Sequence, residues 1–265
     1  MLSERRHQLI LRQLRANGPV SAVFLAEALG VSSATVRRDL VYLDAQGLLT
    51  RVYGGAAPVA GHDDPFVEVA SVRATEKDAI AVHAAGLIED GQTVLLDIGT
   101  TAHRLAQQLH GRPLTVITSN MAVFEELADD DAIQLLVLGG VLRREYRSLV
   151  GFLTEDNLRQ VHADRLFLGT SGVRPDGRVM DTTVVEVPVK RAMIAASDQV
   201  ILLADSAKFP GRGMASVCGP DELDTVVTDA PADTRTAARL REAGVIVIEV
   251  PLAGKDQDGR LDLLP

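Results

Sequence analysis

The chain has 265 residues, enough for two domains, and it is 46% hydrophobic but only 3% aromatic, so any core must be aliphatic. No apolar run approaches the ~20 residues of a membrane-spanning helix, and the N-terminus lacks the apolar stretch and cleavage site of a secretory signal. The single cysteine, Cys218, excludes an intrachain disulfide, so we expect a soluble cytoplasmic protein in which this thiol is a core residue rather than a nucleophile.

The net charge of −9 is unevenly distributed along the chain. Residues 1–57 contain seven arginines and four acidic residues, a net charge of +3, whereas residues 58–265 have a net charge of −12. The positive charge that attraction to nucleic-acid phosphates requires is therefore confined to the first 57 residues.

Three helices followed by a hairpin are predicted in these first 57 residues. The helices are expected over residues 3–16, 22–29 and 33–47, and the hairpin over residues 48–56. Ser21 and Ser32 are good N-cap residues, Gly30 is a natural left-handed C-cap, and the breakers Asn17-Gly18-Pro19 end the first helix. This order of elements is that of a winged helix–turn–helix.

Residues 31–38, VSSATVRR, predict the turn and first turns of a DNA-recognition helix. Val36, Leu40 and Leu43 form one buried stripe, so the polar side chains gather off the stripe at the helix N-terminus, which is the end that enters a major groove. Arginine there can bind guanine or phosphate, although a solvated helix face with two arginines is the alternative from these residues alone. The candidate DNA-binding residues are Ser21, Ser32, Ser33, Thr35, Arg37, Arg38 and Arg51.

Arg51 lies on the predicted hairpin, where it is either a phosphate or minor-groove contact or an exposed strand residue. The stretch VSSATVRRDL followed by LDAQGLLTRVYGGA resembles the N-terminal signature of the DeoR family of bacterial transcriptional regulators. One departure is Tyr53, which stands where the family usually has histidine. This change affects at most a wing contact and leaves the expected fold intact.

Residues 58–75 are predicted to link a DNA-binding domain, residues 1–57, to a second domain, residues 76–265. The stretch PVAGHDDP at residues 58–65 is polar and contains proline and glycine, as linkers do. His62, Asp63 and Asp64 suggest a metal site, but no further ligand stands at helical or hairpin spacing from them. We therefore interpret them as a solvated charge run and expect neither a metal nor a cofactor.

From residue 93 onward, short apolar runs alternate with helical segments. The runs are TVLLD, LTVIT, IQLLVLGG, RLFLG, VILLAD, TVVTD and VIVIEV. Continuous apolar strands separated by helices predict an α/β domain with a mostly parallel sheet covered on both faces. Ligands bind such sheets outside the carboxyl ends of the strands, so the residues that follow the strands are the candidate site.

The first strand is followed by a candidate cradle for phosphate or carboxylate. Gly99 allows close approach of the backbone, and the next N–H groups, with the hydroxyls of Thr100 and Thr101, point out of a helix N-terminus. The loop has neither the GxxxxGK[ST] nor the GxGxxG spacing, so a nucleoside-triphosphate or dinucleotide site is not expected. A plain threonine-capped helix is the alternative. Polar residues follow four further strands, where each taken singly is either a turn residue or a ligand contact.

Six stretches, LDIGTT, VITSN, LGG…RSLVG, DRLFLGTSG, EVPVKR and LLADSAKF, resemble the DeoR-family C-terminal sensor domain in the same order. That domain is similar in fold to ribose-5-phosphate isomerase, glucosamine-phosphate deaminase and CoA transferases. The resemblance implies a phosphorylated sugar or sugar-acid effector. Ser119 departs from the family, which more often has threonine followed directly by asparagine. The candidate effector-binding residues are Asp97, Gly99, Thr100, Thr101, Ser119, Asn120, Gly139, Gly140, Arg143, Ser148, Gly169, Lys190, Asp205 and Lys208.

Two classes of function are compatible with these patterns: a regulator, or a sugar-phosphate isomerase or deaminase with an appended helical domain. Isomerisation needs a positioned carboxylate base, and the related isomerases carry an Asp-Gly-Ala-Asp-Glu run after a strand. This chain has residues 169–173, GTSGV, at the corresponding place, without an acid. We therefore expect a repressor of sugar-metabolism genes and not an enzyme. Its expected partners are a double-stranded DNA operator, a phosphorylated sugar effector and other copies of the chain in a homodimer or homotetramer.

Overall fold

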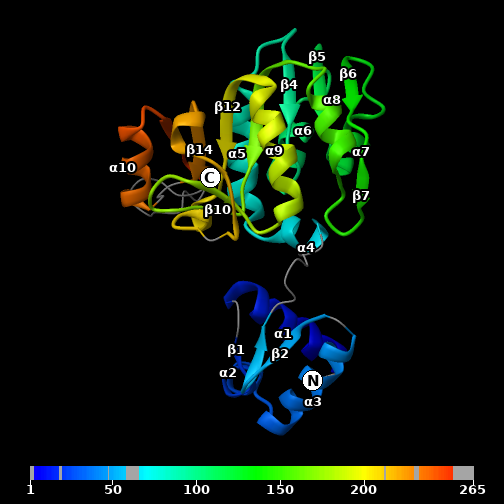
Figure 1. Cartoon of the computed structure of the whole chain (residues 1–265), viewed down its shortest axis with the longest axis vertical. Coiled ribbons are helices and arrows are strands. Elements are labelled where there is room, and N and C mark those ends of the chain that lie inside the picture. The colour runs from blue at the N-terminus through cyan, green and yellow to red at the C-terminus, as the bar shows by residue number, and fades with distance from the viewer. Residues whose placement is uncertain are drawn as a thin grey trace, which may run out of the picture. The chain divides into compact units, whose positions relative to one another are not determined.

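The computed structural model in Figure 1 comprises two compact units, Met1–Asp64 and Pro65–Pro265, each with its own apolar core. The structure describes residues 3–17, 20–46, 48–57, 66–211, 213–229 and 233–252. The predicted breakers at residues 18–19, the helix end near Gly47 and the charge run at residues 62–64 lie outside these ranges. Within the described ranges, no helix combines the length and the apolar character that crossing a membrane requires.

The N-terminal unit consists of three helices and a small antiparallel sheet, the winged helix–turn–helix arrangement that the sequence predicts. Its helices are α1 (Ser3–Asn17), α2 (Ala22–Leu29) and α3 (Ser33–Ala45). Its strands are β1 (Val20–Ser21), β2 (Thr50–Val52) and β3 (Gly55–Ala57), in the order β1-β3-β2. The predicted stripe of Val36, Leu40 and Leu43 is buried in the core of this unit.

Local sequence chemistry determines where α2 and α3 begin and where α2 ends. The hydroxyls of Ser21 and Ser32 each accept a backbone N–H from the third residue beyond, at 3.1 and 3.2 Å, and so cap the two helices. Gly30 ends α2 at φ 64°, a left-handed conformation that glycine adopts without steric cost. Gly55 lets β3 approach β1, because a β-carbon there would lie 2.0 Å from the Val20 carbonyl oxygen.

The C-terminal unit is built on a seven-stranded parallel sheet in the order β15-β14-β12-β9-β4-β5-β6. The strands are β4 (Thr93–Leu96), β5 (Leu114–Thr118), β6 (Ile133–Val137), β9 (Ala163–Gly169), β12 (Ser197–Leu203), β14 (Thr225–Asp229) and β15 (Ile246–Val250). Each strand coincides with one of the seven apolar runs, so the predicted α/β fold with a parallel sheet is confirmed.

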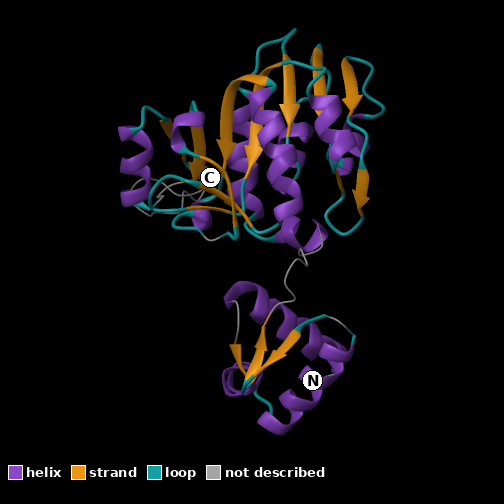
Figure 2. Ribbon diagram, viewed as in Figure 1, coloured by secondary structure: helices purple, strands orange, loops and turns teal. Residues whose placement is uncertain are grey.

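Helices cover both faces of this sheet (Figure 2), which is why its strands contain continuous apolar runs instead of alternating. One face packs on α5 (Ala74–Ala85), α6 (Thr100–Gln107) and α7 (Met121–Leu127). The other packs on α8 (Phe152–Leu158), α9 (Val187–Ala195) and α10 (Thr234–Glu242). Within β4, Val94 and Leu96 belong to the first core and Leu95 to the second.

Several smaller elements lie outside this framework. They are the hairpin of β7 (Val141–Arg143) and β8 (Ser148–Val150), a small sheet of β10 (Gly172–Val173), β11 (Val179–Asp181) and β13 (Ala215–Cys218), the 3-10 turns η1 (Val184–Glu186), η2 (Ser206–Lys208) and η3 (Pro220–Glu222), and α4 (Phe66–Ser71). Helix α4 falls within residues 58–75, the range predicted as a linker. Cys218 is buried, and burial raises the pKa of its thiol to about 12.

Candidate functional site

The direction of strand addition reverses next to β4. The chain first adds β5 and β6 on one side of β4, then returns to place β9 on its other side. Such a reversal leaves a crevice outside the carboxyl ends of the two strands that flank it. Asp97 directly follows β4 and Gly169 ends β9, and the Gly169 N–H donates to Asp97 Oδ2 at 2.8 Å across this boundary.

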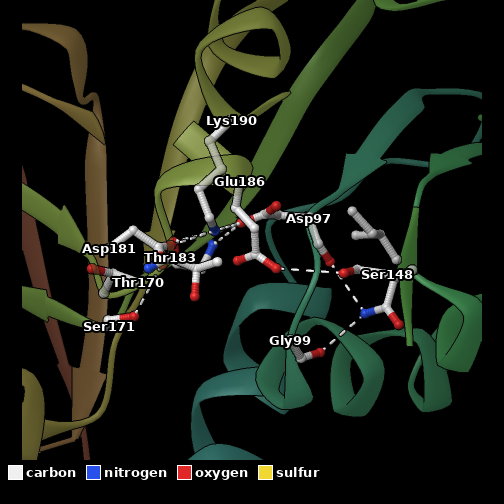
Figure 3. Close-up of polar contacts among 12 residues, drawn as sticks. Asp97, Gly99, Ser148, Thr170, Ser171, Asp181, Thr183, Glu186 and Lys190 are labelled. Carbon is white, nitrogen blue, oxygen red and sulfur yellow. Dashed lines mark hydrogen bonds and ion pairs between the residues drawn. The ribbon is translucent and has the colours of Figure 1, made fainter. Parts of the chain in front are cut away.

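A buried ion pair lies at the centre of this edge (Figure 3). The Lys190 ammonium, on α9, contacts the Asp97 carboxylate, donates to the Gly169 carbonyl at 3.1 Å and lies 3.7 Å from Asp181 Oδ2. Burial opposes the charge on Lys190, but the carboxylates of Asp97 and Asp181 raise its pKa above the ordinary value, so the ammonium stays protonated. Burial raises the pKa of the Asp97 carboxyl, an effect that Lys190 and the Gly169 N–H oppose.

Asn120 holds the backbone loop of the candidate phosphate cradle, residues 99–101, by hydrogen bonds. Its Nδ2 donates to the carbonyls of Gly99 at 3.1 Å and Asp97 at 3.3 Å, and its Oδ1 accepts the Ala122 N–H at 3.0 Å. Gly99 has φ 115°, a conformation that L side chains rarely adopt. Thr100 is buried and Thr101 half-buried at the start of α6. Asn120 thus positions the loop, and both of its amide hydrogens are used in doing so.

The hairpin of β7 and β8 lies on the other side of the loop. The Arg143 guanidinium pairs with the buried carboxylate of Glu186, and the Ser148 hydroxyl donates to the same carboxylate at 3.4 Å. Tyr146, at the turn, lies with its hydroxyl 3.7 Å from the position that a β-carbon on Gly99 would occupy. Burial raises the pKa of Tyr146 to about 12, so its hydroxyl remains a neutral donor.

Two of the predicted residues, Gly139 and Gly140, contact protein rather than the open edge. The Gly139 N–H donates to Asn157 Oδ1 at 3.0 Å. A β-carbon on Gly140 would lie 2.2 Å from Thr154 Oγ1 and 2.9 Å from the Val150 carbonyl oxygen. Gly140 therefore allows the hairpin to pack closely on α8, whereas a β-carbon on Gly139 would lie at an ordinary contact distance, 3.5 Å from Asn157 Oδ1.

A group of cations surrounds the remaining predicted residues, Asp205 and Lys208. Lys77, on α5, is buried, and burial together with nearby Lys208 lowers its pKa to about 8. Its ammonium donates to the Val69 carbonyl at 2.6 Å. Arg73 lies 2.9 Å from Asp205 Oδ1, so this predicted carboxylate is already paired with a cation.

Arg104 completes the cation group one turn into α6, after Thr100. Its guanidinium pairs with Asp78 and donates to the Ala70 carbonyl at 3.0 Å. Sequence reasoning missed Lys77, Arg104 and Tyr146. Lys77 carried a signal, since it is the one lysine or arginine within the helix that precedes β4, whereas nothing local distinguished Tyr146.

Within the described part of the chain, four buried side-chain polar atoms have no hydrogen-bond partner. One of them, Arg73 Nε, lies 2.9 Å from Asp205 Oδ1 in an ion pair, which leaves three atoms at this edge to explain. They are Asp97 Oδ1, Ser119 Oγ and Arg104 Nε. Buried polar groups are almost always satisfied, so unsatisfied ones call for an explanation. The three come from the ends of β4 and β5 and from α6, and they include an acceptor, a charged donor and a hydroxyl that can be either.

In the N-terminal unit, the predicted DNA-binding residues lie around the start of α3 and on the wing. Arg37 and Arg38 are exposed on α3, and Ser33 and Thr35 are partly exposed beside them. The Arg51 side chain is exposed on β2. Its backbone N–H donates to Asp44 Oδ1 at 3.1 Å, which links the wing to α3. Ser21 and Ser32 use their hydroxyls as helix caps.

Asp39, which sequence reasoning did not single out, orients α3. Its buried carboxylate accepts from Arg6 Nε at 2.5 Å and Nη2 at 2.9 Å, and it lies 3.0 Å from His7 Nε2. Burial raises the pKa of Asp39, but the hydrogen bonds from Arg6 and His7 outweigh burial and hold the pKa below its ordinary value. The ion pair therefore fixes α3 on α1.

Both units match known sequence families. The model described as the DeoR-like helix-turn-helix domain matches residues 6–60, and that of the DeoR C terminal sensor domain matches residues 72–230. The glycerol-3-phosphate regulon repressor of Escherichia coli K12 is 34% identical over 87% of this chain and 92% of its own. The transcriptional repressor AccR of Agrobacterium fabrum is 36% identical over 88% and 92%. Ribose 5-phosphate isomerase A from Methanocaldococcus jannaschii matches at a TM-score of 0.37 and 15% identity over 50% of this chain and 52% of that one.

Proposed function

The chain belongs to the DeoR family of transcriptional regulators, and we propose that it represses sugar-metabolism genes until a phosphorylated sugar binds at the carboxyl edge of its parallel sheet. In this proposal residues 1–57 bind operator DNA, residues 76–265 bind the effector, and residues 58–75 link them. Relatives of this chain are named as repressors, one of them of a glycerol-3-phosphate regulon.

The observation that carries the effector proposal is the combination of unsatisfied polar atoms and cations at one edge of the sheet. The N–H groups at the start of α6 suit a phosphate, and Arg104 follows one turn later on the same helix, with Lys77 and Lys208 close to one another on the neighbouring elements. Asp97 Oδ1 and Ser119 Oγ, both buried and unsatisfied in the described part of the chain, suit sugar hydroxyls.

The same geometry favours binding over catalysis. Asp97 is the carboxylate best placed to remove a proton, yet its other oxygen contacts the Lys190 ammonium and accepts the Gly169 N–H. Oδ1 stays open to a ligand, but residues 169–173, GTSGV, contain no acid at the place where the related isomerases carry an acidic run. Asp205 is similarly paired with Arg73.

The DNA-binding proposal rests on α3. Its exposed arginines lie at the end that enters a major groove, and Arg51 extends the positive surface onto the wing. A homodimer or homotetramer would present two such helices to half-sites about one helical turn, or a multiple of it, apart. By linkage, the effector and the operator weaken each other's binding by the same factor.

The first test is a thermal-shift panel of phosphorylated sugars, each beside its unphosphorylated parent. A ligand that binds only the folded protein raises the melting temperature. We expect one phosphorylated sugar to do so while its parent does not, and to release the protein from a duplex selected out of a random DNA pool. If no phosphorylated sugar shifts the melting temperature or releases the duplex, the effector proposal is wrong.

Paired substitutions separate the two halves of the proposal. Thr101→Ala should abolish the thermal shift and leave duplex binding intact, whereas Thr115→Ala, at the opposite end of β5, should change neither. Arg37→Ala should weaken duplex binding without affecting the thermal shift, and the exposed Arg159→Ala is its matched control. Unchanged duplex affinity in the Arg37 variant would contradict the assignment of α3.

A further inference from the structure

Helix α4 is the first described element after the N-terminal unit, and it docks on the edge of the sheet to which the strands point (Figure 1). Only residues 58–65 separate it from β3 in the sequence. The buried Phe66 ring lies 6.3 Å from the Tyr146 ring and 5.7 Å from the His103 ring, and its N–H donates to the Glu145 carbonyl at 2.9 Å. The docked helix thus touches both α6 and the β7–β8 turn.

The C-terminal end of α4 contacts two of the cations described above. The Val69 carbonyl accepts from the Lys77 ammonium at 2.6 Å, and the Ala70 carbonyl accepts from the Arg104 guanidinium at 3.0 Å. The last carbonyls of any helix lack partners within the helix, and in a six-residue helix they are a large share of all carbonyls. The buried Lys77 and the half-buried Arg104 therefore hold α4 in place.

A phosphate is a stronger partner for these cations than a carbonyl. The bonds from these cations to carbonyls already have a charged donor, but a phosphate adds a charged acceptor, and with it Coulomb attraction, and offers three acceptor oxygens. Arg104 also has an unsatisfied Nε for such a ligand, within the described part of the chain. An anion bound at the start of α6 would thus compete with α4 for the same two side chains.

We propose that α4 transmits effector binding to the DNA-binding domain, an inference that rests on the proposed function. The bound phosphate accepts the hydrogen bonds that Lys77 and Arg104 otherwise donate to the α4 carbonyls. Helix α4 then dissociates from the sheet edge. The docked helix then belongs to the DNA-binding form of the protein and the undocked helix to the released form. Because α4 is joined to β3 by eight residues, its release alters the tether of the recognition domain.

The test without a ligand uses Phe66→Ala, which removes the docking side chain but neither cation. Because α4 then dissociates without any ligand, the variant should bind the selected duplex more weakly than the wild type, within the ~5- to 150-fold range of allosteric coupling. Val67→Ala, on the exposed side of the same helix, is the matched control and should bind as the wild type does. Wild-type affinity in a folded Phe66→Ala protein would overturn the proposal.

The second measurement is hydrogen exchange of residues 66–72 in the wild type, with saturating inorganic phosphate against the same ionic strength of chloride. Phosphate should speed exchange of the Phe66 amide, which donates to Glu145 in the docked helix. Unchanged exchange would overturn the coupling even if Phe66→Ala does not fold. Failure of the proposed function gives a different result from failure of the α4 proposal. In that case no sugar phosphate would shift the melting temperature of any variant or release it from the duplex.

Discussion

Replacing Lys190 by methionine tests the buried ion pair at the centre of the candidate effector site. Methionine has a similar length but no charge, so Asp97, which is 0% exposed, would lose its neighbouring ammonium. Removing one partner of a buried pair costs about 3–5 kcal/mol, because the remaining charge is uncompensated. For a unit of this size each kcal/mol lowers the melting temperature by about 2–4 °C, so we expect a loss of about 6–20 °C.

The double variant Asp97→Asn/Lys190→Met identifies the cause of that loss. Asparagine can still accept the Gly169 N–H, and the Asp97 charge is gone, whereas the buried Asp181 carboxylate, 3.7 Å from Lys190 in the wild type, remains. The double variant should therefore recover part of the lost stability. The assay is scanning calorimetry of the sensor-domain transition, with the transition of the N-terminal unit as an internal reference. A single variant within about 2 °C of the wild type, or a double variant no better than the single one, would refute this reasoning.

The pH dependence of the single variant provides a further check. Burial already raises the pKa of Asp97, and without Lys190 less opposes that rise. A carboxyl whose folded pKa exceeds its unfolded value binds its proton more tightly in the folded state. The stability deficit of Lys190→Met should therefore shrink as the pH falls toward the folded pKa, and a constant deficit would contradict the assignment.

Three more predictions concern other parts of the chain. Ser32→Ala should destabilise the N-terminal unit by about 1 kcal/mol in thermal unfolding, because it removes the cap of α3, whereas equal loss in Ser33→Ala would argue against capping. Hydrogen bonds from Glu126 and Asp130 raise the pKa of His110, so the stability it contributes should be full below about pH 6.5 and lost as the pH rises through its folded pKa. The difference in melting temperature between wild type and His110→Gln should therefore narrow as the pH rises, and a difference independent of pH would exclude a contribution from protonated His110. Burial raises the pKa of Cys218 to about 12, so the folded protein should react with a thiol reagent at neutral pH far more slowly than the unfolded chain, and equal rates would contradict its burial.

The local elements of this protein could be predicted from the sequence because each depends on neighbouring residues. The seven apolar runs became the seven strands of the parallel sheet, and Ser21, Ser32 and Gly30 bound the helices as their chemistry requires. The position of the candidate site also followed, since parallel strands all end at one edge of their sheet. Helix α4 was missed because six residues are too few to show a helical period.

What each side chain does at that edge depended on the tertiary structure. The Asn120 amide holds the Gly99 loop, while its predicted contact with the effector stays a prediction. Lys190 neutralises Asp97 from 93 residues away along the chain. Tyr146 and Lys77 reach the candidate site only because the β7–β8 turn lies beside Gly99 and α5 packs against α6. A sequence pattern reports contacts within a few residues of one another, whereas the partner of a buried polar group is determined by which distant elements the folded core brings together.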